Sequence, residues 1–344
     1  MTSIYIMLAY AKAAAPPKPV LATAIAELRR RGYEVLIGVA ETQAIRPERL
    51  AVAADLYVLK SHSSLWLALS AVLHAQGARI LNPYPACSEV MNKVLATWRL
   101  AAAGVPTPRT WVTGDLARLS AAGAIPPLVL KPNLGGRGVG VRVLHDKRDL
   151  DGATATDGML VQEFVPGDPR LVKLYGLGDE VFGVRRDADG TRRQLAVRPG
   201  LAELARRCAR AFGLALYGVD VIDGDAGPTV IDVNYFPSYT GVPRAGERLA
   251  EFIAAYANGR SLGPNGSHRH LAGGSRSDPA TTVSQDGDRI RRHASRPSTA
   301  TVDSARTVST RRGDRRATVS SRRRTRRRRG PAEGGRRSRR RHRR

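Results

Sequence analysis

The stretch Lys131-Pro132-Asn133-Leu134-Gly135-Gly136-Arg137-Gly138-Val139-Gly140 directly follows the apolar run Pro127 to Leu130. Its four glycines in six residues let backbone N–H groups turn toward an anion, and the lysine at its root adds a compact positive charge. No Gly-Lys-Ser/Thr follows, so it is not a P-loop, and Val141 breaks the spacing of the dinucleotide-binding glycine motif. The stretch therefore indicates a phosphate cradle of another kind, with a glycine-rich hairpin between two strands as the alternative.

Charge is unevenly distributed along the 344 residues. Residues 261–344 hold 25 of the 56 basic and 6 of the 30 acidic side chains, so most of the net charge of +26 lies there. This segment has almost no large apolar side chains to offset the entropy of ordering, which predicts a disordered tail over 263–344. The preceding residues are rich in Ala, Val, Leu and Ile, enough for a sizeable core.

The tail suggests a second class of function. Its arginine clusters, Ser321 to Arg329 and Arg336 to Arg344, contain no aromatic residues. Such a composition favours salt-sensitive binding to nucleic acid or another polyanion without base recognition. The alternative is an extension with no function of its own.

The two cysteines and the N-terminus indicate the cellular compartment in which the protein is expected. Cys87 and Cys208 are far apart and lack metal-ligand spacing, which predicts reduced thiols in a cytoplasmic protein. No apolar run reaches 18 residues, and the N-terminus lacks the basic start and cleavage site of a signal peptide, so no membrane partner is expected. Nothing in the sequence indicates the oligomeric state.

Apolar runs alternate with helical periodicity in the first part of the chain, which predicts an α/β domain with a parallel sheet over residues 1–84. Its strands are expected over Ile4–Ala9, Val35–Val39, Leu56–Leu59 and Ile80–Leu81, and its helices over Val20–Arg31 and Leu65–Gln76. Lys60 and His62 follow the third strand, at the edge where parallel sheets commonly present ligand-binding residues.

The residue pattern in the second part of the chain predicts short strands with turns between them. This arrangement is typical of α+β subdomains built on antiparallel sheets. We expect one subdomain over 85–160 and another over 161–262, because two such sheets can enclose a flat ligand. One helix is expected from Ser88 to Ala103 and another over Leu201–Phe212. The strands are expected over Thr110–Val112, Leu128–Leu130, Val139–Leu144, Met159–Phe164, Leu171–Leu177, Glu180–Val184, Leu216–Ile222 and Pro228–Val233.

Polar residues interrupt the last two of these strands. Asp220 lies in one strand and Asp232 and Asn234 lie in the next, with a polar turn between them. Because strand side chains alternate, Asp232 and Asn234 share a face, and Asp220 can join them from the partner strand. Two carboxylates and an amide oxygen suit Mg²⁺, while the alternative is a solvated hairpin face. The flank Tyr235 to Pro243 then turns sharply and brings aromatic groups beside this set.

Five features in this order and spacing resemble the ATP-grasp superfamily over residues 1 to 260. They are Lys131-Pro132 with its glycine loop, Gln162-Glu163-Phe164-Val165, Lys173, Asp220, and Asp232-Val233-Asn234. The resemblance implies an N-terminal α/β domain followed by two α+β subdomains that enclose ATP.

The resemblance also implies roles for individual residues. The residues expected to bind the nucleotide are Lys93, Lys131, Gly135, Gly136, Gly138, Gln162, Glu163, Val165 and Asp168. Lys173 and Arg186 are expected to face the γ-phosphate and the acceptor, and Asp220, Asp232 and Asn234 to bind Mg²⁺, with Mn²⁺ as the alternative ion. For Lys173, Glu163 and Asp168, a solvated surface position is the alternative.

Two branches of the superfamily compete for the reaction. Asp232-Val233-Asn234 with its Tyr-Phe-Pro-Ser-Tyr flank is similar to the inositol polyphosphate 5/6-kinases, whereas Gly-Gly-Arg-Gly-Val-Gly is more like the RimK-type ligases. We expect a carboxylate-amine ligase that acts through an acylphosphate, with a small-molecule kinase as the alternative. The arginines from Arg185 to Arg198 indicate a small anionic acceptor, or else a solvated hairpin.

Overall fold

The computed structural model describes residues 1–9, 19–133, 140–151, 159–166, 171–187 and 189–260. None of the helices in these ranges combines the length and apolar character needed to span a bilayer. The predicted tail lies outside the described residues, as do the loop glycines Gly135, Gly136 and Gly138 and also Asp168.

The N-terminal part contains the predicted parallel sheet, in the order β2-β1-β3-β4. Its strands are β1 (Ser3–Met7), β2 (Glu34–Gly38), β3 (Leu56–Leu59) and β4 (Ile80–Leu81), with helices α2 (Pro19–Arg30) and α3 (Ser64–Ala75) and the 3-10 turns η1 (Ala40–Thr42) and η2 (Pro47–Arg49). Helix α2 buries residues spaced by three and four, and Gly32 takes the left-handed conformation just beyond it (φ +85°).

Two helices stand where the sequence predicted one. Helix α4 (Tyr84–Met91) ends at Asn92, and α5 (Lys93–Ala102) begins after it, so the prediction of a single helix from Ser88 to Ala103 is wrong. Asn92 is extended, and its side chain caps α5 by accepting a hydrogen bond from the Leu95 N–H at 3.1 Å. The Lys93 N–H donates to the Asn133 carbonyl, so a distant contact fixes where α5 starts.

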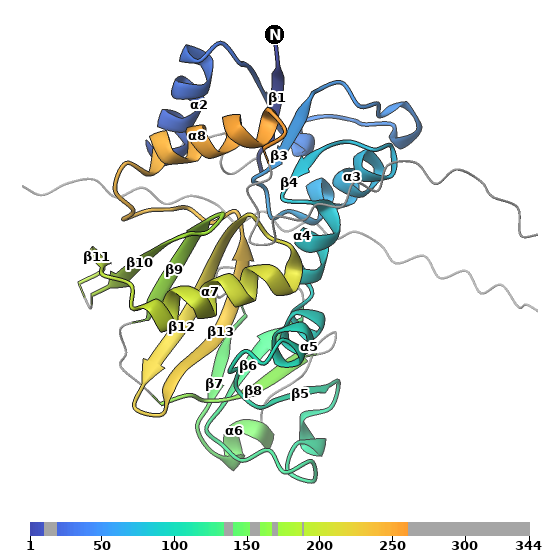
Figure 1. The fold of residues 1–344 in the computed structure, drawn as a ribbon. Coiled ribbons are helices and arrows are strands. Elements are labelled where there is room, and N and C mark those ends of the chain that lie inside the picture. Colours follow the sequence, from blue (N-terminus) through green and yellow to red (C-terminus); the bar gives the residue numbers. More distant parts are fainter. Residues whose placement is uncertain (10–18, 134–139, 152–158, 167–170, 188, 261–344) are drawn as a thin grey trace, which may run out of the picture. The chain divides into compact units, whose positions relative to one another are not determined.

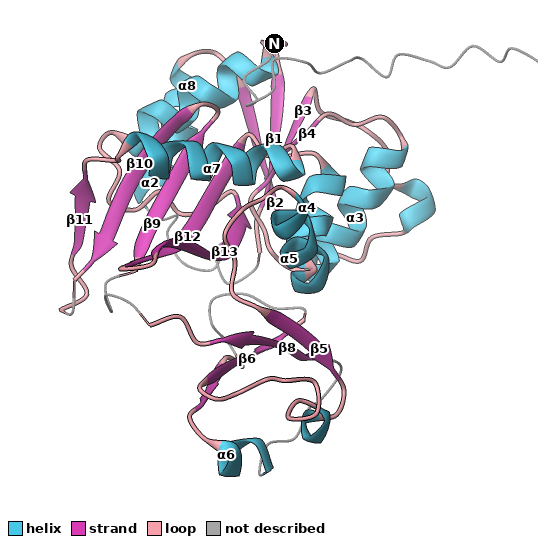
Figure 2. Ribbon diagram, turned by 60° about the horizontal axis from the view of Figure 1, so that its bottom comes forward, coloured by secondary structure: helices cyan, strands magenta, loops and turns pink. Residues whose placement is uncertain are grey.

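A four-stranded antiparallel sheet in the order β5-β8-β6-β7 follows (Figure 2). It consists of β5 (Thr110–Thr113), β6 (Leu128–Pro132), β7 (Arg142–Leu144) and β8 (Met159–Glu163), with η3 (Leu116–Arg118) and α6 (Lys147–Asp151). One face of this sheet has a small core of its own. That core contains Leu116, Leu119, Ala124, Leu128, Leu130, Leu144, Leu150, Met159 and Val161.

The third sheet is antiparallel, with five strands in the order β11-β10-β9-β12-β13. Helix α7 lies across one of its faces, and the last helix, α8, packs against α2 of the N-terminal part (Figure 1). The bounds are β9 (Val172–Leu177), β10 (Glu180–Arg186), β11 (Arg192–Leu195), α7 (Pro199–Phe212), β12 (Leu216–Gly224), β13 (Gly227–Tyr235) and α8 (Ala245–Ala257). Neither strand β11 nor helix α8 was predicted from the sequence.

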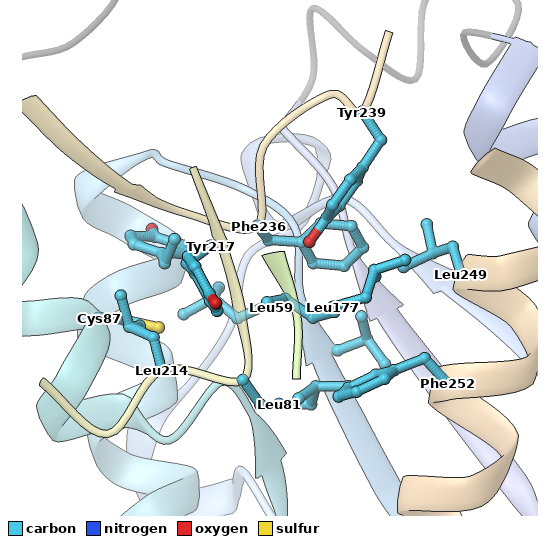
Figure 3. Close-up of a cluster of buried hydrophobic side chains, with 14 of the residues drawn as sticks. Leu59, Leu81, Cys87, Leu177, Leu214, Tyr217, Phe236, Tyr239, Leu249 and Phe252 are labelled. Atoms are coloured by element: carbon cyan, nitrogen blue, oxygen red, sulfur yellow. The ribbon is translucent and has the colours of Figure 1, made fainter. Parts of the chain in front are cut away.

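The N-terminal sheet and the five-stranded sheet share one hydrophobic core (Figure 3). Leu59 and Leu81 from the parallel sheet lie among Leu177, Tyr217 and Phe236 from the antiparallel sheet region. Segments far apart in the chain are therefore fixed to one another by burial of apolar surface.

Candidate active site

Lys131 lies near the end of β6, where the predicted phosphate loop begins. Its ammonium donates to the Gln162 side-chain oxygen at 2.6 Å and to the Ile231 carbonyl at 3.2 Å. Burial lowers the pKa of Lys131, an effect that the charge of Asp232 opposes. The ammonium of Lys131 is held by an amide oxygen and a backbone carbonyl rather than by an ion pair with a carboxylate, so its charge is available to an anion.

A β-bulge in β13 supplies one of these dipoles. Asp220 pairs with Asp232 across the hairpin, whereas Val221 pairs with Val230, which leaves Ile231 as the extra residue. The Ile231 carbonyl accepts from Lys131, and the Val230 N–H donates to the carbonyl of Pro106. The bulge thus joins the five-stranded sheet to the segment that leads into β5.

Two ion pairs surround the predicted metal ligands. Lys173 on β9 donates to both carboxylate oxygens of Asp220 at 2.7 Å, and Lys93 at the start of α5 lies 2.5 Å from Asp232 Oδ1. Asn234 donates its amide N–H to Asp232 Oδ2 at 3.1 Å. Burial raises the pKa of the Asp220 carboxyl, against the lowering effect of Lys173, and Asp232 adds to the rise. The structure brings the three predicted ligands and two predicted lysines together.

The donor set of Asp220, Asp232 and Asn234 fits a hard divalent cation. Two carboxylates supply charge, and because the Asn234 amide nitrogen is bonded to Asp232, its oxygen can serve as a third donor. Among the described residues, no cluster of three or more His, Cys, Asp or Glu side chains is arranged to hold a metal. A cation here would therefore depend on the amide and on ligand oxygens from a bound phosphate.

Gln162 and Glu163, which were both predicted to bind the nucleotide, make side-chain contacts with different partners. Gln162 is only 4% exposed, and its amide joins Lys131 to the Thr110 hydroxyl, so in this structure its side chain supports the lysine. Glu163 pairs with the exposed Arg109 at 2.6 Å. Val165 follows β8 and is half-buried.

An apolar platform on the four-stranded sheet was missed in the sequence. Opposed residues of neighbouring strands share a face, and the register sets Val129 opposite both Val143 and Gln162. Lys131 lies two residues beyond Val129 on the same strand and so shares that face. Val143 remains 38% exposed. The alternation of apolar residues with Lys131 could have indicated this face, but only with the strand pairing known.

Lys60 and His62 do not present a ligand edge in this structure. Lys60 donates to the carbonyls of Phe236 and Pro237 at 2.6 and 2.8 Å, and His62 Nε2 lies 2.8 Å from the Tyr235 carbonyl oxygen. The edge of the parallel sheet instead contacts the turn that follows the metal-ligand strand.

The arginine-rich hairpin is partly neutralised. Arg193 pairs with Asp187 at 2.6 Å, and Arg198 pairs with Asp223 at 2.5 Å. Arg186 is the last residue of β10, and its backbone pairs with that of Arg192.

Comparison with known proteins identifies the architecture. The family described as an ATP-grasp domain matches residues 90–185, and that described as an inositol 1,3,4-trisphosphate 5/6-kinase ATP-grasp domain matches residues 187–255. A crystal structure of a RimK domain ATP-grasp protein from Sphaerobacter thermophilus is similar over 72% of this chain and 98% of its own, with a TM-score of 0.62 and 20% identity. This chain has the ATP-grasp fold.

Two proteins named as ligases are similar to this chain. A probable alpha-L-glutamate ligase from Xanthomonas campestris pv. campestris is 33% identical over 194 residues, 49% of this chain and 66% of the relative, so the match spans just under two thirds of that relative. The ATP-grasp ligase PsnB, solved with a phosphomimetic variant of its minimal precursor, Mg and ADP, is similar over 74% of this chain and 99% of its own, with a TM-score of 0.56 and 19% identity.

Proposed function

We propose that this chain is an ATP- and Mg²⁺-dependent carboxylate-amine ligase. The proposal is carried by the pairing of Lys93 and Lys173 with Asp232 and Asp220, beside Lys131. The lysines can bind the phosphates of a nucleoside triphosphate while a divalent cation binds the carboxylates, so each of these charged side chains keeps a partner of opposite charge in a partly buried site. The relative named a probable alpha-L-glutamate ligase supports a ligase reaction rather than phosphoryl transfer to a hydroxyl.

Each part of the site has a proposed role in nucleotide binding. The platform of Val129 and Val143 would contact the base, and Lys131 would hold the α-phosphate. The remaining nucleotide contacts are proposed for Lys93, Gly135, Gly136, Gly138, Gln162, Glu163, Val165 and Asp168.

The proposed reaction has two steps. A carboxylate oxygen of the acceptor attacks the γ-phosphorus of ATP, the bond to the bridging oxygen breaks, and ADP leaves an acylphosphate behind. The amine nitrogen then attacks the acyl carbon, inorganic phosphate departs, and the nitrogen gives a proton to solvent. Lys173 and Arg186 would neutralise charge on the transferred phosphoryl group and the acceptor.

Asp220, Asp232 and Asn234 are the proposed holders of Mg²⁺, with Mn²⁺ as the alternative ion. When bound there, the ion would neutralise charge that develops on the phosphate oxygens. Most ATP-grasp ligases carry glutamate where Asp232 stands, and the aspartate side chain is one methylene shorter, so its carboxylate would reach less far toward a bound ion.

A small-molecule kinase is the second candidate. The match of residues 187–255 to the inositol trisphosphate kinase domain covers the metal-ligand hairpin, and Asp232 stands where most ATP-grasp ligases carry glutamate. In that reaction a hydroxyl oxygen would receive the γ-phosphoryl group, and no amide would form.

Oxygen labelling separates the two reactions. The full chain is supplied with ATP, Mg²⁺ and pools of acceptors that carry ¹⁸O in their carboxylates. Glutamate is the amine substrate that is tried first. We expect one labelled oxygen in each inorganic phosphate together with an amide product. A phosphorylated acceptor without free phosphate would establish the kinase, and ADP release that needs no acceptor would contradict both. Asp232→Ala controls for contaminating enzymes.

The setting of this reaction is also a proposal. A cytoplasmic location agrees with buried free thiols at Cys87 and Cys208. We retain the division into domains 1–84, 85–160 and 161–262 with a tail over 263–344. A small anionic acceptor and polyanion binding by the tail complete the proposal.

A further inference from the structure

Two side chains just beyond β3 contact three consecutive carbonyls, the first at the end of β13, the strand that carries Asp232 and Asn234, and the other two in the turn that follows it. His62 contacts the Tyr235 carbonyl, and Lys60 donates to those of Phe236 and Pro237. Lys60 is 9% exposed, and its ammonium lies 4.4 Å from the centre of the Phe236 ring. In the reverse direction, the Tyr235 hydroxyl donates to the Ser61 carbonyl at 2.7 Å. This two-way contact begins one residue after Asn234.

The turn that these contacts hold is one that most residues avoid. Phe236 has φ +40° and Tyr239 has φ +52°, both in the left-handed region that residues other than glycine rarely adopt. Such a conformation persists only where surrounding contacts determine it. Phe236 lies in the shared core near Leu59 (Figure 3), and Lys60 fixes the carbonyl of the same residue.

The far end of the turn is fixed to the five-stranded sheet. The Tyr239 hydroxyl donates to the Gly176 carbonyl at 2.8 Å, and Gly241 lies so close to Val184 that an added Cβ would come within 2.9 Å of its side chain. Val184 pairs with Lys173 across β9 and β10. Residues 236–241 therefore contact the cross-strand neighbour of Lys173, the lysine proposed to face the transferred phosphoryl group.

We propose that Lys60 is a positioning residue that sets Asn234 and the acceptor-side turn 236–241 in register with Lys173. The inference rests on the proposed function, because it assigns the turn to the acceptor side of that site. Lys60 acts through the two backbone carbonyls and touches neither ATP nor the acceptor.

The chain contains a matched control for this anchor. Arg79, from the same N-terminal part, donates to the carbonyls of Tyr256 and Ala257 at 2.7 and 3.0 Å, and its guanidinium lies 6.0 Å from the Tyr256 ring. The contact is of the same kind, with two consecutive carbonyls and one ring. It is made to α8 rather than to the turn after Asn234.

Three full-length variants test the proposal. Lys60→Met removes the donor and keeps the apolar stem, Lys60→Gln restores an amide donor, and Arg79→Met removes the control anchor. We expect Lys60→Met to lower kcat/KM for the acceptor about 10- to 100-fold, the size usual for residues that orient ligands. ATP affinity without divalent ion should stay within about twofold, Lys60→Gln should recover part of the loss, and Arg79→Met should lower Tm with little kinetic change.

Hydrogen exchange gives a readout independent of turnover. Lys60→Met should accelerate exchange of the amides in 235–241 and leave α8 unchanged, and Arg79→Met should do the reverse. If Lys60→Met and Arg79→Met lower Tm equally and have the same kcat/KM for the acceptor, Lys60 has only a structural role and the proposal fails. It also fails if Lys60→Met weakens ATP binding as much as it slows turnover.

If the wild-type chain turns over no acceptor, that result counts against the proposed function but not against the positioning role of Lys60. Mn²⁺ binding in the presence of ADP would then decide the role of Lys60. Binding about tenfold weaker in Lys60→Met than in Arg79→Met would support positioning of Asn234, and equal binding would overturn it.

Discussion

The two sheets that supply the candidate site balance charge in different ways. The ion-pair face, made by Lys93, Lys173, Asp220, Asp232 and Asn234, matches each lysine with a carboxylate. The apolar face, made by Val129, Lys131, Val143 and Gln162, holds its lysine with an amide and a carbonyl beside the half-buried Val129 and the exposed Val143. In the first, the carboxylates can exchange their lysine partners for a metal ion while the lysines turn to phosphates, and the second can hold a flat base next to a phosphate.

Removing one charge from the ion-pair face should have the largest effect. Asp232→Asn keeps the shape of the side chain but leaves Lys93 without its carboxylate and weakens any bound cation. We expect ATP-dependent turnover to fall about 100- to 1000-fold, the range seen when one electrostatic stabiliser is lost. Initial rates at saturating ATP would measure this.

The control for Asp232 uses an ion pair on the same sheet away from the site. Glu180→Gln breaks the exposed pair with Arg248, which lies 2.8 Å away, and should change turnover less than about twofold because exposed pairs contribute little. Similar losses in both variants would mean that the ion-pair face has no special role.

Removing the charge from the apolar face should weaken ATP binding more than it slows the chemical step. Lys131→Met deletes the ammonium, and a hydrogen bond to a charged group is worth about 1.5–3 kcal/mol, which is about 10- to 100-fold in the dissociation constant of ATP. Titration calorimetry without divalent ion would measure it. Lys147→Met is the control, since Lys147 is an exposed lysine of α6 near the same sheet. Unchanged ATP affinity in Lys131→Met would remove Lys131 from the site.

Some parts of both faces could be predicted from the sequence. Strand alternation was enough to set Asp232 and Asn234 on one face, because their separation of two residues is a local property. The bulge at Ile231 was not predictable, since it exists only in the register between β12 and β13.

The errors share a physical cause, which is contact between distant segments. Asn92 breaks a helix with no glycine or proline nearby, and the break coincides with the contact of Lys93 to Asn133. Lys60 and His62 were correctly placed at a strand edge, but the neighbour of that edge is a turn about 175 residues later in the chain. The residue pattern within one segment does not show which distant segment it will contact.

The two faces should also differ in their pH dependence. Burial lowers the pKa of Lys131, with Lys93 adding to the shift and Asp232 and Asp220 opposing it. Lys131 is therefore charged below this lowered pKa and loses its proton as the pH rises through it, while an unfolded chain keeps the proton to about pH 10.4. Over that interval ATP affinity should fall, and the free energy of unfolding without ligand should rise because the unfolded state binds more protons.

Arginine distinguishes this titration from a general alkaline effect. Lys131→Arg stays charged throughout, so its ATP affinity, although lower near neutrality, should lose the alkaline decline of about tenfold per pH unit. Binding isotherms from pH 7 to 10 would measure both proteins. An equal decline in the two would assign it to another group.

The smallest expected effect belongs to Val143, the exposed valine of the apolar face. Val143→Thr is almost isosteric but replaces a methyl with a hydroxyl where the base is proposed to lie, and a change of this size in an apolar pocket is worth about 1 kcal/mol, or about fivefold in ATP affinity. Val52→Thr makes the same replacement at a similarly exposed valine of the N-terminal part and should change nothing. The comparison is informative because tripolyphosphate, which has no base, should bind both variants equally. If Val143→Thr weakens tripolyphosphate as much as ATP, the valines support Lys131 and the base lies elsewhere.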